Sequence, residues 1–543
     1  MDSPAIARAL VEELLAAGVS DFVACPGSRS AAIALTLADA ERRGLIRLHV
    51  RIDERSGAYL ALGLAKGSGR PVAVVTTSGT AAVNLHPAVV EAAYSGVPLI
   101  AVTADRPAEV RGSGANQTID QRALYGDDVV TWVDLEGMSE SALRASVASA
   151  LDLAVAQSGP VHLNVPLTEP LVAAGQHAIS PVTARSPRIS TTGQAQSLAD
   201  LLPAGVDVAR GVLIAGDFDD EVVREGAGRL ATAMGWPIIS EPSGNLSAHP
   251  HSMRHGPLIM ERFTPDVIVT VGRVGLHRPE TNALKSARAH IAVDVPPRLG
   301  RVDPARTAVA VVDTVPIGMG DIDSAWLEQW RAADDSAASG VDGALADASL
   351  TGPVVSRIVA QRATADDTLV IGASWPVRHV SLYAGVLRAR CIGNRGTSGI
   401  DGVVSTAWGI ALTRRTGTTY ALVGDLTAIY DRNGLLAAPT EELPRLTYVV
   451  IDNDGGGIFS MLEQGAPDFA QDFERVFGTP HGADLAALLA APRISLESVD
   501  SVAGLRSALD IERTGVHVIV ARCASRAEEA AQVAALRSAA SAS

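Results

Sequence analysis

Short runs of apolar residues recur along the chain and alternate with longer stretches in which apolar residues have helical spacing. Because helices cover both faces of a parallel sheet, its buried strands are short and almost continuously apolar. The first third of the chain therefore predicts an α/β domain. A helix is expected first, with Ser3 as its N-cap and Gly18 just beyond its end. The expected strands are 21–24, 48–50, 71–75 and 98–104.

The same alternation returns in two further blocks. Two stretches rich in small and polar residues, 174–196 and 332–349, are expected to link the blocks. We therefore predict an α/β fold class with three consecutive doubly wound parallel-sheet domains, at residues 1–180, 197–335 and 350–543. The expected strands are 211–217, 266–272 and 290–295 in the middle block, and 367–374, 389–394, 419–425, 446–454 and 516–521 in the last.

Composition and charge exclude several classes of protein. Of the 543 residues, 47% are hydrophobic and 19% are charged, which excludes a disordered chain. No apolar run has the roughly 18 residues of a membrane span, and the start lacks a secretory signal pattern. The 45 basic and 60 acidic residues give a net charge of −15, which disfavours nucleic acid and anionic membranes as partners. Three scattered cysteines form no disulfide framework, so we expect a cytoplasmic protein.

Two oxygen-bearing motifs follow apolar runs of the last third. Asp425 follows Gly424 at the end of one run, and Asn453-Asp454-Gly455 ends the next. In a parallel sheet, the carboxyl ends of adjacent strands open onto the crevice where ligands bind. Carboxylate, amide and main-chain oxygens suit Mg²⁺, which also takes phosphate oxygens as ligands. Each motif alone is more typical of a helix cap or a tight turn, but together they favour a metal–diphosphate site.

Glu54 lies at a predicted strand-to-helix junction, in the sequence RIDERSGAYLALGLA. A carboxylate there most often only complements the helix dipole, which is worth less than about 1 kcal/mol at a surface. The alternative is an acid that hydrogen-bonds a bound heterocycle. The residue alone favours the first interpretation.

Arginines are frequent in the glycine- and serine-rich loops at predicted strand ends. Arginine binds a carboxylate through two parallel hydrogen bonds, so several arginines in one site indicate a substrate with several carboxylates. Each arginine alone is more often a surface or salt-bridge residue. Their presence in all three predicted domains favours convergence on one site. The set is Arg29 with Ser28, Arg106, Arg278 with His277, Arg378 and Arg395, and Gln117 belongs with it.

These features resemble the thiamine-diphosphate enzymes of the pyruvate-decarboxylase type, in domain order, in the glutamate after the second strand and in the GD…N metal motif. Within that family, the strings CPGSR, TSGTAAVNLHPAVVEA, GANQTIDQ, GASWPVR, NRGTSGIDG and IDNDGGGIFSML resemble menaquinone-pathway synthases. The resemblance is specific in the first and last thirds and thin in the middle, where it depends mainly on GLHRP.

The resemblance implies the cofactors and the reaction. The cofactors are thiamine diphosphate and Mg²⁺ or Mn²⁺. The enzyme decarboxylates 2-oxoglutarate and adds the succinyl carbanion to isochorismate, which gives 2-succinyl-5-enolpyruvyl-6-hydroxy-3-cyclohexene-1-carboxylate and CO₂. In this family the site forms between the first domain of one subunit and the third domain of another, which implies a homodimer or a dimer of dimers.

The resemblance also implies roles for individual residues. Glu54 is the acid that hydrogen-bonds the aminopyrimidine of the cofactor, and the metal ligands are Asp425, Asn453 and the Gly455 carbonyl. The other expected cofactor contacts are Pro26, Ser78, Asn84, Gly399, Ile400, Leu426, Thr427, Gly456 and Ile458. The residues expected around the succinyl group are Gln117, Ser374, Arg378 and Arg395, and those around isochorismate are Ser28, Arg29, Arg106, His277 and Arg278. Phe459 and Leu462 are expected to wall the pocket and exclude water.

The chain departs from common family patterns at two positions. Leu426 stands where the wider family has glycine, although it agrees with the narrower group. His277 stands where a lysine is frequent, so one expected cation becomes titratable.

Three alternatives remain from the sequence. Another thiamine-diphosphate 2-oxoacid decarboxylase, or an acetohydroxyacid-synthase-like carboligase, would use monocarboxylates and leave the arginines unexplained. A non-catalytic binding module would not need Glu54, Asp425 and Asn453 together. A dinucleotide-binding protein is the weakest alternative, because no GxGxxG opens a helix after a strand.

Overall fold

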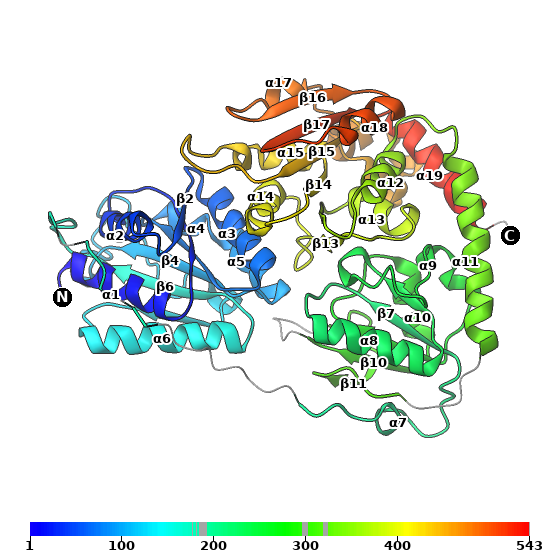
Figure 1. Cartoon of the computed structure of the whole chain (residues 1–543), viewed down its shortest axis with the longest axis horizontal. Helices are drawn as coiled ribbons and strands as arrows, with labels where there is room; N and C mark the ends of the chain where they lie inside the picture. The colour runs from blue at the N-terminus through cyan, green and yellow to red at the C-terminus, as the bar shows by residue number, and fades with distance from the viewer. Residues whose placement is uncertain (176, 181, 184–192, 296–301, 319–323, 542–543) are drawn as a thin grey trace.

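The computed structural model describes residues 1–175, 177–180, 182–183, 193–295, 302–318 and 324–541. Three β-sheets organise these residues, and the paired strands of each sheet run parallel (Figure 1). Alternate residues of a strand face two different cores: Val72 and Val74 pack on one side of the first sheet, and Ala73 and Val75 on the other. Helices thus cover both faces, which confirms the predicted doubly wound fold class. We call the parts that carry the sheets the first, middle and third domains.

The first domain has six strands in the order β2-β1-β3-β4-β6-β5. Its helix α1 is capped by Asp2, whose side chain accepts from the Ala5 N–H at 2.8 Å, so the prediction that Ser3 is the N-cap was wrong. The strands are β1 (Asp21–Ala24), β2 (Arg47–Val50), β3 (Val72–Thr76), β4 (Leu99–Asp105), β5 (Thr131–Asp134) and β6 (Val161–Pro166). The helices are α1 (Ser3–Ala16), α2 (Ala31–Arg42), α3 (Glu54–Ser68), α4 (Thr80–Val83), α5 (His86–Ser95) and α6 (Glu140–Ala156).

The middle domain has five strands in the order β11-β10-β9-β7-β8. The strands are β7 (Gly211–Ala215), β8 (Ile238–Ser240), β9 (Val267–Val271), β10 (Ala289–Val293) and β11 (Ala308–Val312). The helices are α7 (Leu198–Leu201), α8 (Glu221–Met234), α9 (Gly256–Ile259) and α10 (Arg278–Ser286). The predicted linker 174–196 falls partly outside the described residues.

The third domain has six strands in the order β13-β12-β14-β15-β17-β16. The strands are β12 (Thr368–Ile371), β13 (Arg390–Ile392), β14 (Thr419–Gly424), β15 (Leu446–Asp452), β16 (Ser495–Val499) and β17 (Val516–Arg522). The helices are α12 (Gly352–Arg362), α13 (Trp375–Tyr383), α14 (Val403–Thr413), α15 (Asp425–Tyr430), α16 (Ala470–Phe473), α17 (Leu485–Leu488), α18 (Val502–Asp510) and α19 (Arg526–Ser541).

The second predicted linker, 332–349, lies mostly in the long helix α11 (Ser324–Leu345). Trp326, Trp330 and Val341 bury one side of this helix in a core that it shares with the middle domain and with α19 (Figure 1). The small residues that resembled a linker allow this close packing. None of the helices in the described ranges is both long enough and apolar enough to cross a membrane.

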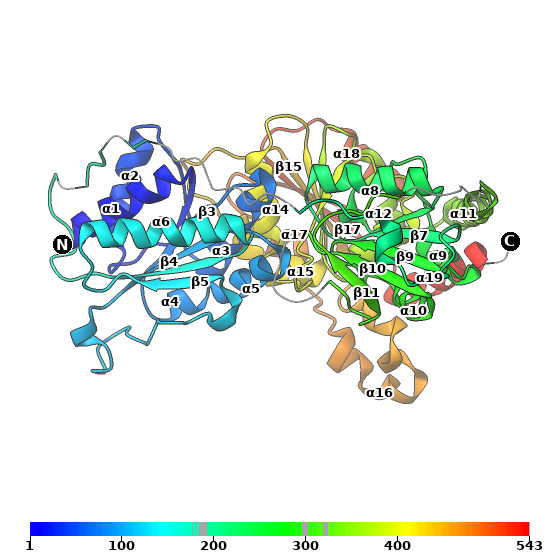
Figure 2. The same ribbon diagram turned by 90° about the horizontal axis from the view of Figure 1, so that it is seen from below.

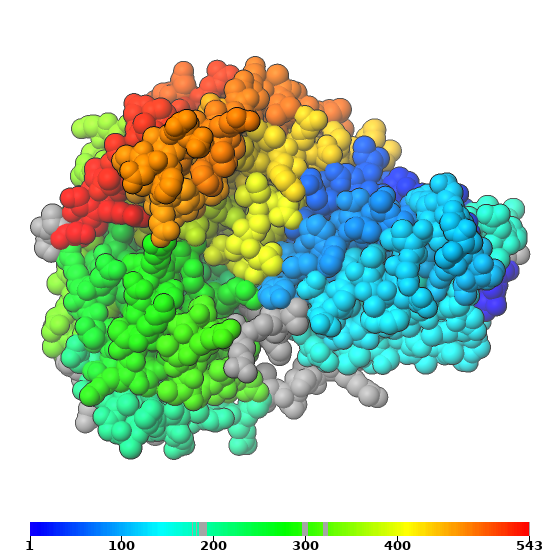
Figure 3. All heavy atoms as spheres, turned by 180° about the vertical axis from the view of Figure 1, so that it is seen from behind, coloured from blue at the N-terminus to red at the C-terminus, as the bar shows by residue number. Residues whose placement is uncertain are grey.

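Helices α3 and α14 join the first domain to the third. They contribute Leu60, Leu64, Ala407 and Ile410 to one continuous core, although the middle domain separates them in sequence. Figure 3 shows the blue first domain directly against the yellow part of the third domain. In contrast, the segment around α16 projects away from the body of the molecule (Figure 2).

Candidate active site

The ends of β14 and β15 bring the predicted metal ligands together. The two strands pair side by side, with Gly424 opposite Ile451, so the residues that follow them leave the sheet at one edge. Asp425 Oδ2 accepts hydrogen bonds from the main-chain N–H groups of Gly455 at 2.8 Å and Asn453 at 3.2 Å. Burial raises the pKa of the Asp425 carboxyl, and the main-chain N–H groups of Gly455 and Leu426, which donate to it, oppose the rise.

The Asn453 amide group lies against Asp425 Oδ2 and the Gly455 carbonyl oxygen, and its other end lies 3.4 Å from the Glu529 carboxylate. Without a cation, the amide satisfies these atoms best with its NH₂ group donating to Asp425 Oδ2 at 3.3 Å and to the Gly455 oxygen at 3.0 Å. With a cation bound, the amide would turn its oxygen to the same point, so that three oxygens converge there. The residues present therefore fit a hard divalent ion such as Mg²⁺.

Two residues beside this centre were missed by the sequence analysis. His481 Nε2 lies 3.4 Å from Asp425 Oδ2 and 3.7 Å from Asp452 Oδ1, and these three side chains form a group that could hold a metal ion. The buried Glu529 on α19 lies beside the Asn453 amide and also accepts from the Gly352 N–H at 2.9 Å. Neither residue comes directly after β14 or β15 in the sequence, so only the three-dimensional fold brings them to the metal centre.

The glycines after Asn453 allow a close approach of the main chain. Gly455 has φ +124°, and a Cβ there would lie only 2.1 Å from the Gly478 oxygen. A Cβ on Gly456 would lie 2.3 Å from the Phe477 oxygen. The 3₁₀ turn Gly457–Met461 follows and carries Ile458 and Phe459, and Leu462 comes directly after it. The predicted diphosphate contacts Leu426 and Thr427 lie in the first turn of α15, at the same sheet edge.

Glu54 is the first residue of α3, at the end of the first sheet. Asp53 caps this helix by accepting from the Arg55 and Ser56 N–H groups at 3.0 and 3.2 Å, and this fixes where the helix begins. Glu54 is partly buried. Burial of the Cys25 thiol raises its pKa, and the negative charge of Glu54 is the next largest cause of this rise. The exposed Pro26 follows Cys25 directly.

Three predicted ligand-binding residues meet in the first domain. Arg106 donates to the Ser78 hydroxyl and, at 3.0 Å, to the Gln117 carbonyl oxygen. The Gln117 amide in turn donates to the Ser78 carbonyl oxygen at 3.0 Å. Burial, followed by the like charge of Arg29, lowers the pKa of Arg106, while the charges of Asp105 and Glu169 oppose this shift. Asn84, which caps the C-terminal end of α4 six residues after Ser78, is exposed.

A second arginine pair lies between the middle and third domains. Arg378, on α13, donates to the Ser374 carbonyl oxygen at 3.0 Å. Burial, followed by the like charge of Arg395, lowers the pKa of Arg378. The two like charges raise the local positive potential, which the charge of Glu241 offsets in part and which a carboxylate-bearing ligand would neutralise further.

His277 joins this second group as a neutral side chain. It is buried, and its Nε2 shares a hydrogen bond with the Ser381 hydroxyl at 3.0 Å. Burial, followed by the charges of Arg378 and Arg395, lowers the pKa of His277 to about 3. The expected titratable cation is thus absent at neutral pH, and Arg278 is the charged member of this dipeptide. Arg278 is exposed at the start of α10.

The predicted site residues therefore form separate groups within one chain. The first-domain group contains Glu54, Arg29 and Arg106 with their neighbours, and the third-domain group surrounds Asp425 and Arg378. Among the described residues, no hydrogen bond or ion pair joins Glu54, Arg29 or Arg106 itself to Asp425, Asn453 or Arg378, although Arg55, the neighbour of Glu54, donates to the Tyr430 carbonyl oxygen at the end of α15 at 2.8 Å. Gly399 and Ile400 lie in a partly buried loop that ends at the start of α14. Ser28 is exposed in the loop after β1.

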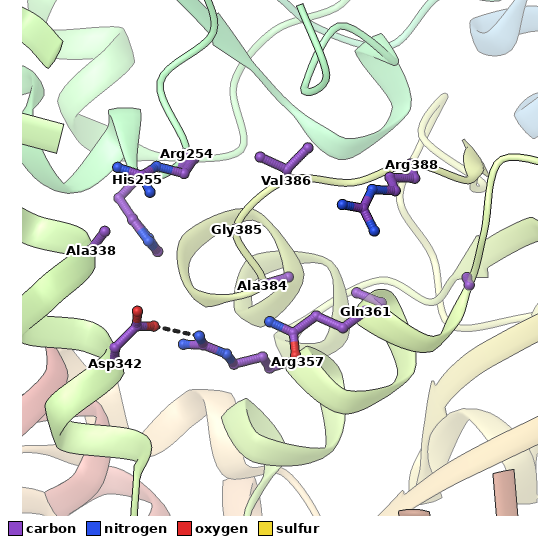
Figure 4. Close-up of a pocket in the computed structure, with 12 residues that line it drawn as sticks. Arg254, His255, Ala338, Asp342, Arg357, Gln361, Ala384, Gly385, Val386 and Arg388 are labelled. Atoms are coloured by element: carbon purple, nitrogen blue, oxygen red, sulfur yellow. Dashed lines mark hydrogen bonds and ion pairs between the residues drawn. The ribbon is translucent and has the colours of Figure 1, made fainter. Parts of the chain in front are cut away.

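A pocket of about 360 Å³ lies elsewhere, between the middle and third domains and α11 (Figure 4). Arg254, Arg357 and Arg388 point into it, and Arg357 forms an ion pair with Asp342. None of the residues predicted to bind cofactor or substrate lines this pocket.

Comparisons with known proteins identify the family. Residues 5–124 match the thiamine pyrophosphate enzyme family, in its N-terminal TPP-binding domain. A 2-succinyl-5-enolpyruvyl-6-hydroxy-3-cyclohexene-1-carboxylate synthase of Saccharopolyspora erythraea is 40% identical over 97% of this chain and 96% of its own. The chain belongs to this synthase family. Two further synthases of the same name support this assignment. The one from Thermobifida fusca is 42% identical over 93% of this chain and 91% of its own length, and the one from Mycobacterium avium is 40% identical over 94% of this chain and 95% of its own length.

Membership of the synthase family confirms the resemblance found in the sequence, and the matched TPP-binding domain confirms thiamine diphosphate as the cofactor, with a divalent metal. The roles of the individual site residues stay predictions. The synthase-family match spans all three domains, including the middle domain where the motifs were thin.

Proposed function

We propose that this chain decarboxylates 2-oxoglutarate and transfers the succinyl carbanion to isochorismate, which gives 2-succinyl-5-enolpyruvyl-6-hydroxy-3-cyclohexene-1-carboxylate and CO₂ for menaquinone synthesis. The family places it among enzymes of this name. The observation that favours these substrates over monocarboxylates is the grouping of arginines as Arg29 with Arg106 and Arg378 with Arg395, each group with a protein carboxylate near it: Glu169 pairs with Arg29, and the charge of Glu241 acts on Arg378. Both proposed substrates are dicarboxylates, so each pair has a ligand that neutralises it.

The chain's own residues would hold the cofactor at two points. Asp425, Asn453 and the Gly455 carbonyl would bind the metal ion, and Leu426 and Thr427 would lie beside the diphosphate. Glu54 would hydrogen-bond the aminopyrimidine ring and hold a proton there. When bound, thiamine diphosphate supplies a carbanion equivalent at its thiazolium ring, which is the hard part of the chemistry.

The pocket must also exclude water, because a proton from water would end the reaction at succinic semialdehyde. Phe459 is partly buried, and its ring lies 5.8 Å from that of Phe477. Leu462, in contrast, is 38% exposed. We expect isochorismate to cover Leu462 when it binds.

We propose that the complete site forms between two copies of the chain, as a homodimer or a dimer of dimers. Within one chain, the residue after Glu54 contacts the far end of α15 and not its metal-binding start, so we propose that a partner's first domain supplies Glu54. Apolar residues beside this group are exposed: Ile52 by 74% and Val83 by 43%. A subunit interface would bury them. A cytoplasmic location is proposed because the three cysteines are free thiols.

The function is tested by following the loss of isochorismate absorbance in the purified enzyme. Loss should require 2-oxoglutarate, thiamine diphosphate and a divalent ion together, and omission of any one should abolish it. Pyruvate should not replace 2-oxoglutarate in CO₂ release. Comparable turnover of pyruvate would instead favour a simple 2-oxoacid decarboxylase or an acetohydroxyacid-synthase-like carboligase.

A further inference from the structure

The loop between β13 and α14 carries Arg395, and the first domain of the same chain holds this loop. Lys66, on α3, donates from Nζ to the Gly393 carbonyl oxygen at 2.7 Å. Glu91, on α5, accepts from the Gly396 N–H at 2.9 Å and from the Thr397 N–H at 2.7 Å. The contacts therefore flank Arg395 on both sides, at two residues before it and one residue after it.

Lys66 and Glu91 form a buried ion pair in which the charged atoms of both side chains all have hydrogen-bond or ion-pair partners. Lys66 Nζ lies 3.3 Å from Glu91 Oε1 and donates to the Ser95 hydroxyl at 3.1 Å. The Ser95 and Thr397 hydroxyls donate to Glu91 at 2.7 and 2.9 Å. Burial would raise the pKa of Glu91, but the Lys66 charge and these donors outweigh it and lower the pKa. A buried charge pair with every partner in place fixes its geometry tightly.

The fit between the pair and the loop is close. A Cβ on Gly396 would lie 2.6 Å from the Glu91 carbonyl oxygen and 2.8 Å from the Ser95 hydroxyl, so only glycine lets the loop approach α5 this closely. The far end of the loop is held independently, because the Tyr59 hydroxyl donates to Asp401. The first domain thus holds the loop at both ends, and Arg395 lies at the end held by Lys66 and Glu91.

Among the described residues, Arg395 makes no hydrogen bond and no ion pair within 4 Å, although its charge acts on the buried Glu241 and Glu280 carboxyls. The direct contacts that hold it in place are therefore those of the main chain that carries it. We propose that Lys66 and Glu91 are positioning residues for 2-oxoglutarate: they fix the main chain around Arg395 so that its guanidinium group faces Arg378. This inference rests on the proposed function. It gives the first domain a role in substrate recognition within its own chain, in addition to the cofactor acid.

The inference is tested with Glu91→Gln, which keeps the side-chain shape but replaces one acceptor oxygen with NH₂. We expect the KM for 2-oxoglutarate to rise at least tenfold. The KM for isochorismate and the apparent Kd for thiamine diphosphate should change less than twofold, and kcat at saturating 2-oxoglutarate should be largely kept. A merely structural loss would lower kcat and affect all three ligands alike.

A second variant, Lys66→Met with Glu91→Leu, keeps the test valid if Glu91→Gln does not fold, because a buried ion pair can be replaced by apolar residues of similar volume. It should show the same selective rise in KM. Glu12→Gln is the matched control, since it breaks the ion pair with Arg144 inside the first domain, away from the loop. It should leave every KM unchanged.

Two results would overturn the inference: a folded variant with an unchanged KM for 2-oxoglutarate, or an equal loss for all ligands. If the parent enzyme itself does not use 2-oxoglutarate, the proposed function fails first, and the two failures remain distinguishable.

Discussion

Asp425 and Asn453 were predictable as partners because each follows an apolar strand, and the rule that ligands bind at carboxyl strand ends applies to short segments of sequence. His481 and Glu529 were not predictable. They reach the same centre from a loop and from the C-terminal helix, and no local pattern marks either of them. The proximity of residues was therefore predictable where they follow adjacent strand ends, and not where it depends on tertiary packing.

Glu54 is the residue whose chemistry is most directly testable. Glu54→Gln should bind thiamine diphosphate and metal with unchanged affinity but lose at least a hundredfold in kcat, because the amide cannot hold the proton that the acid holds. Calorimetry for binding and steady-state kinetics check the two parts. Activity equal to that of the parent would remove Glu54 from the catalytic machinery.

His277 makes a prediction about pH and stability. Its pKa is about 3 in the folded protein against an ordinary value of 6.5. Between pH 3 and pH 6.5, His277 is therefore protonated in the unfolded chain and neutral in the folded chain. This favours folding above pH 6.5, and the advantage is lost as pH falls towards 3. From pH 8 to pH 5 the parent should lose about 2 kcal/mol more than His277→Gln. Denaturant unfolding at the two pH values measures the difference.

Ser381→Ala is the control for this experiment, because it removes the partner of His277 but keeps the imidazole. It should retain the pH dependence of the parent. An identical pH dependence in His277→Gln and the parent would show that His277 is not the group responsible.

At the scale of elements, the sequence predicted most interior strands and the edge strands β2 and β13, but it missed the buried interior strand β6 and the edge strands β5, β8, β11 and β16. Strands β1, β7 and β12 are buried along their length and β14 in all but its last residue, so each consists mainly of apolar residues. The edge strands β5, β11 and β16 are only partly buried or exposed, and the polar residues of β5 and β16 interrupt any apolar run, whereas β11 is apolar throughout and was still not predicted. Strand β8 has only three residues. The fold class could thus be predicted, but not the width of each sheet.

The contact between α3 and α14 was also beyond the sequence, because it joins residues 347 positions apart. Here glycine lets the two helices touch main chain to main chain. A Cβ on Gly63 would lie 2.1 Å from the Thr406 oxygen, and one on Gly409 would lie 2.3 Å from the Leu60 oxygen.

Gly63→Ala should therefore destabilise the protein by about 1–3 kcal/mol, as expected for overpacking a core. Gly343→Ala is the matched control: this glycine is also helical, is exposed, and has open space where its Cβ would be. It should stabilise the protein by about 0.5–1 kcal/mol, since alanine is the better helix former. Thermal unfolding of both variants provides the comparison, and equal effects would contradict the close contact.

At the scale of the whole molecule, the separation of the two site halves leads to a test of the dimer. Glu54→Gln and Asp425→Asn should each be inactive alone. When subunits of the two variants pair at random, half of the dimers are mixed, and each mixed dimer has one intact site. Activity should therefore return to about one quarter of the parent value, as the symmetry of a shared interface requires.

If each chain built its own complete site, mixing the variants would restore nothing. The subunits can be mixed by co-expression with two different affinity tags, so that the mixed dimer is purified by itself and assayed against each parent variant.

The packing of α3 against α14 also affects how the chain folds during its synthesis. Translation at roughly 5–20 residues per second leaves roughly 17–70 s between the emergence of these two helices. During that interval the nascent first domain carries an uncovered apolar stripe containing Leu60 and Leu64. Ribosome-stalled chains that stop before residue 400 should accordingly be protease-sensitive and retained by holding chaperones, and release should follow once residue 413 has cleared the exit tunnel.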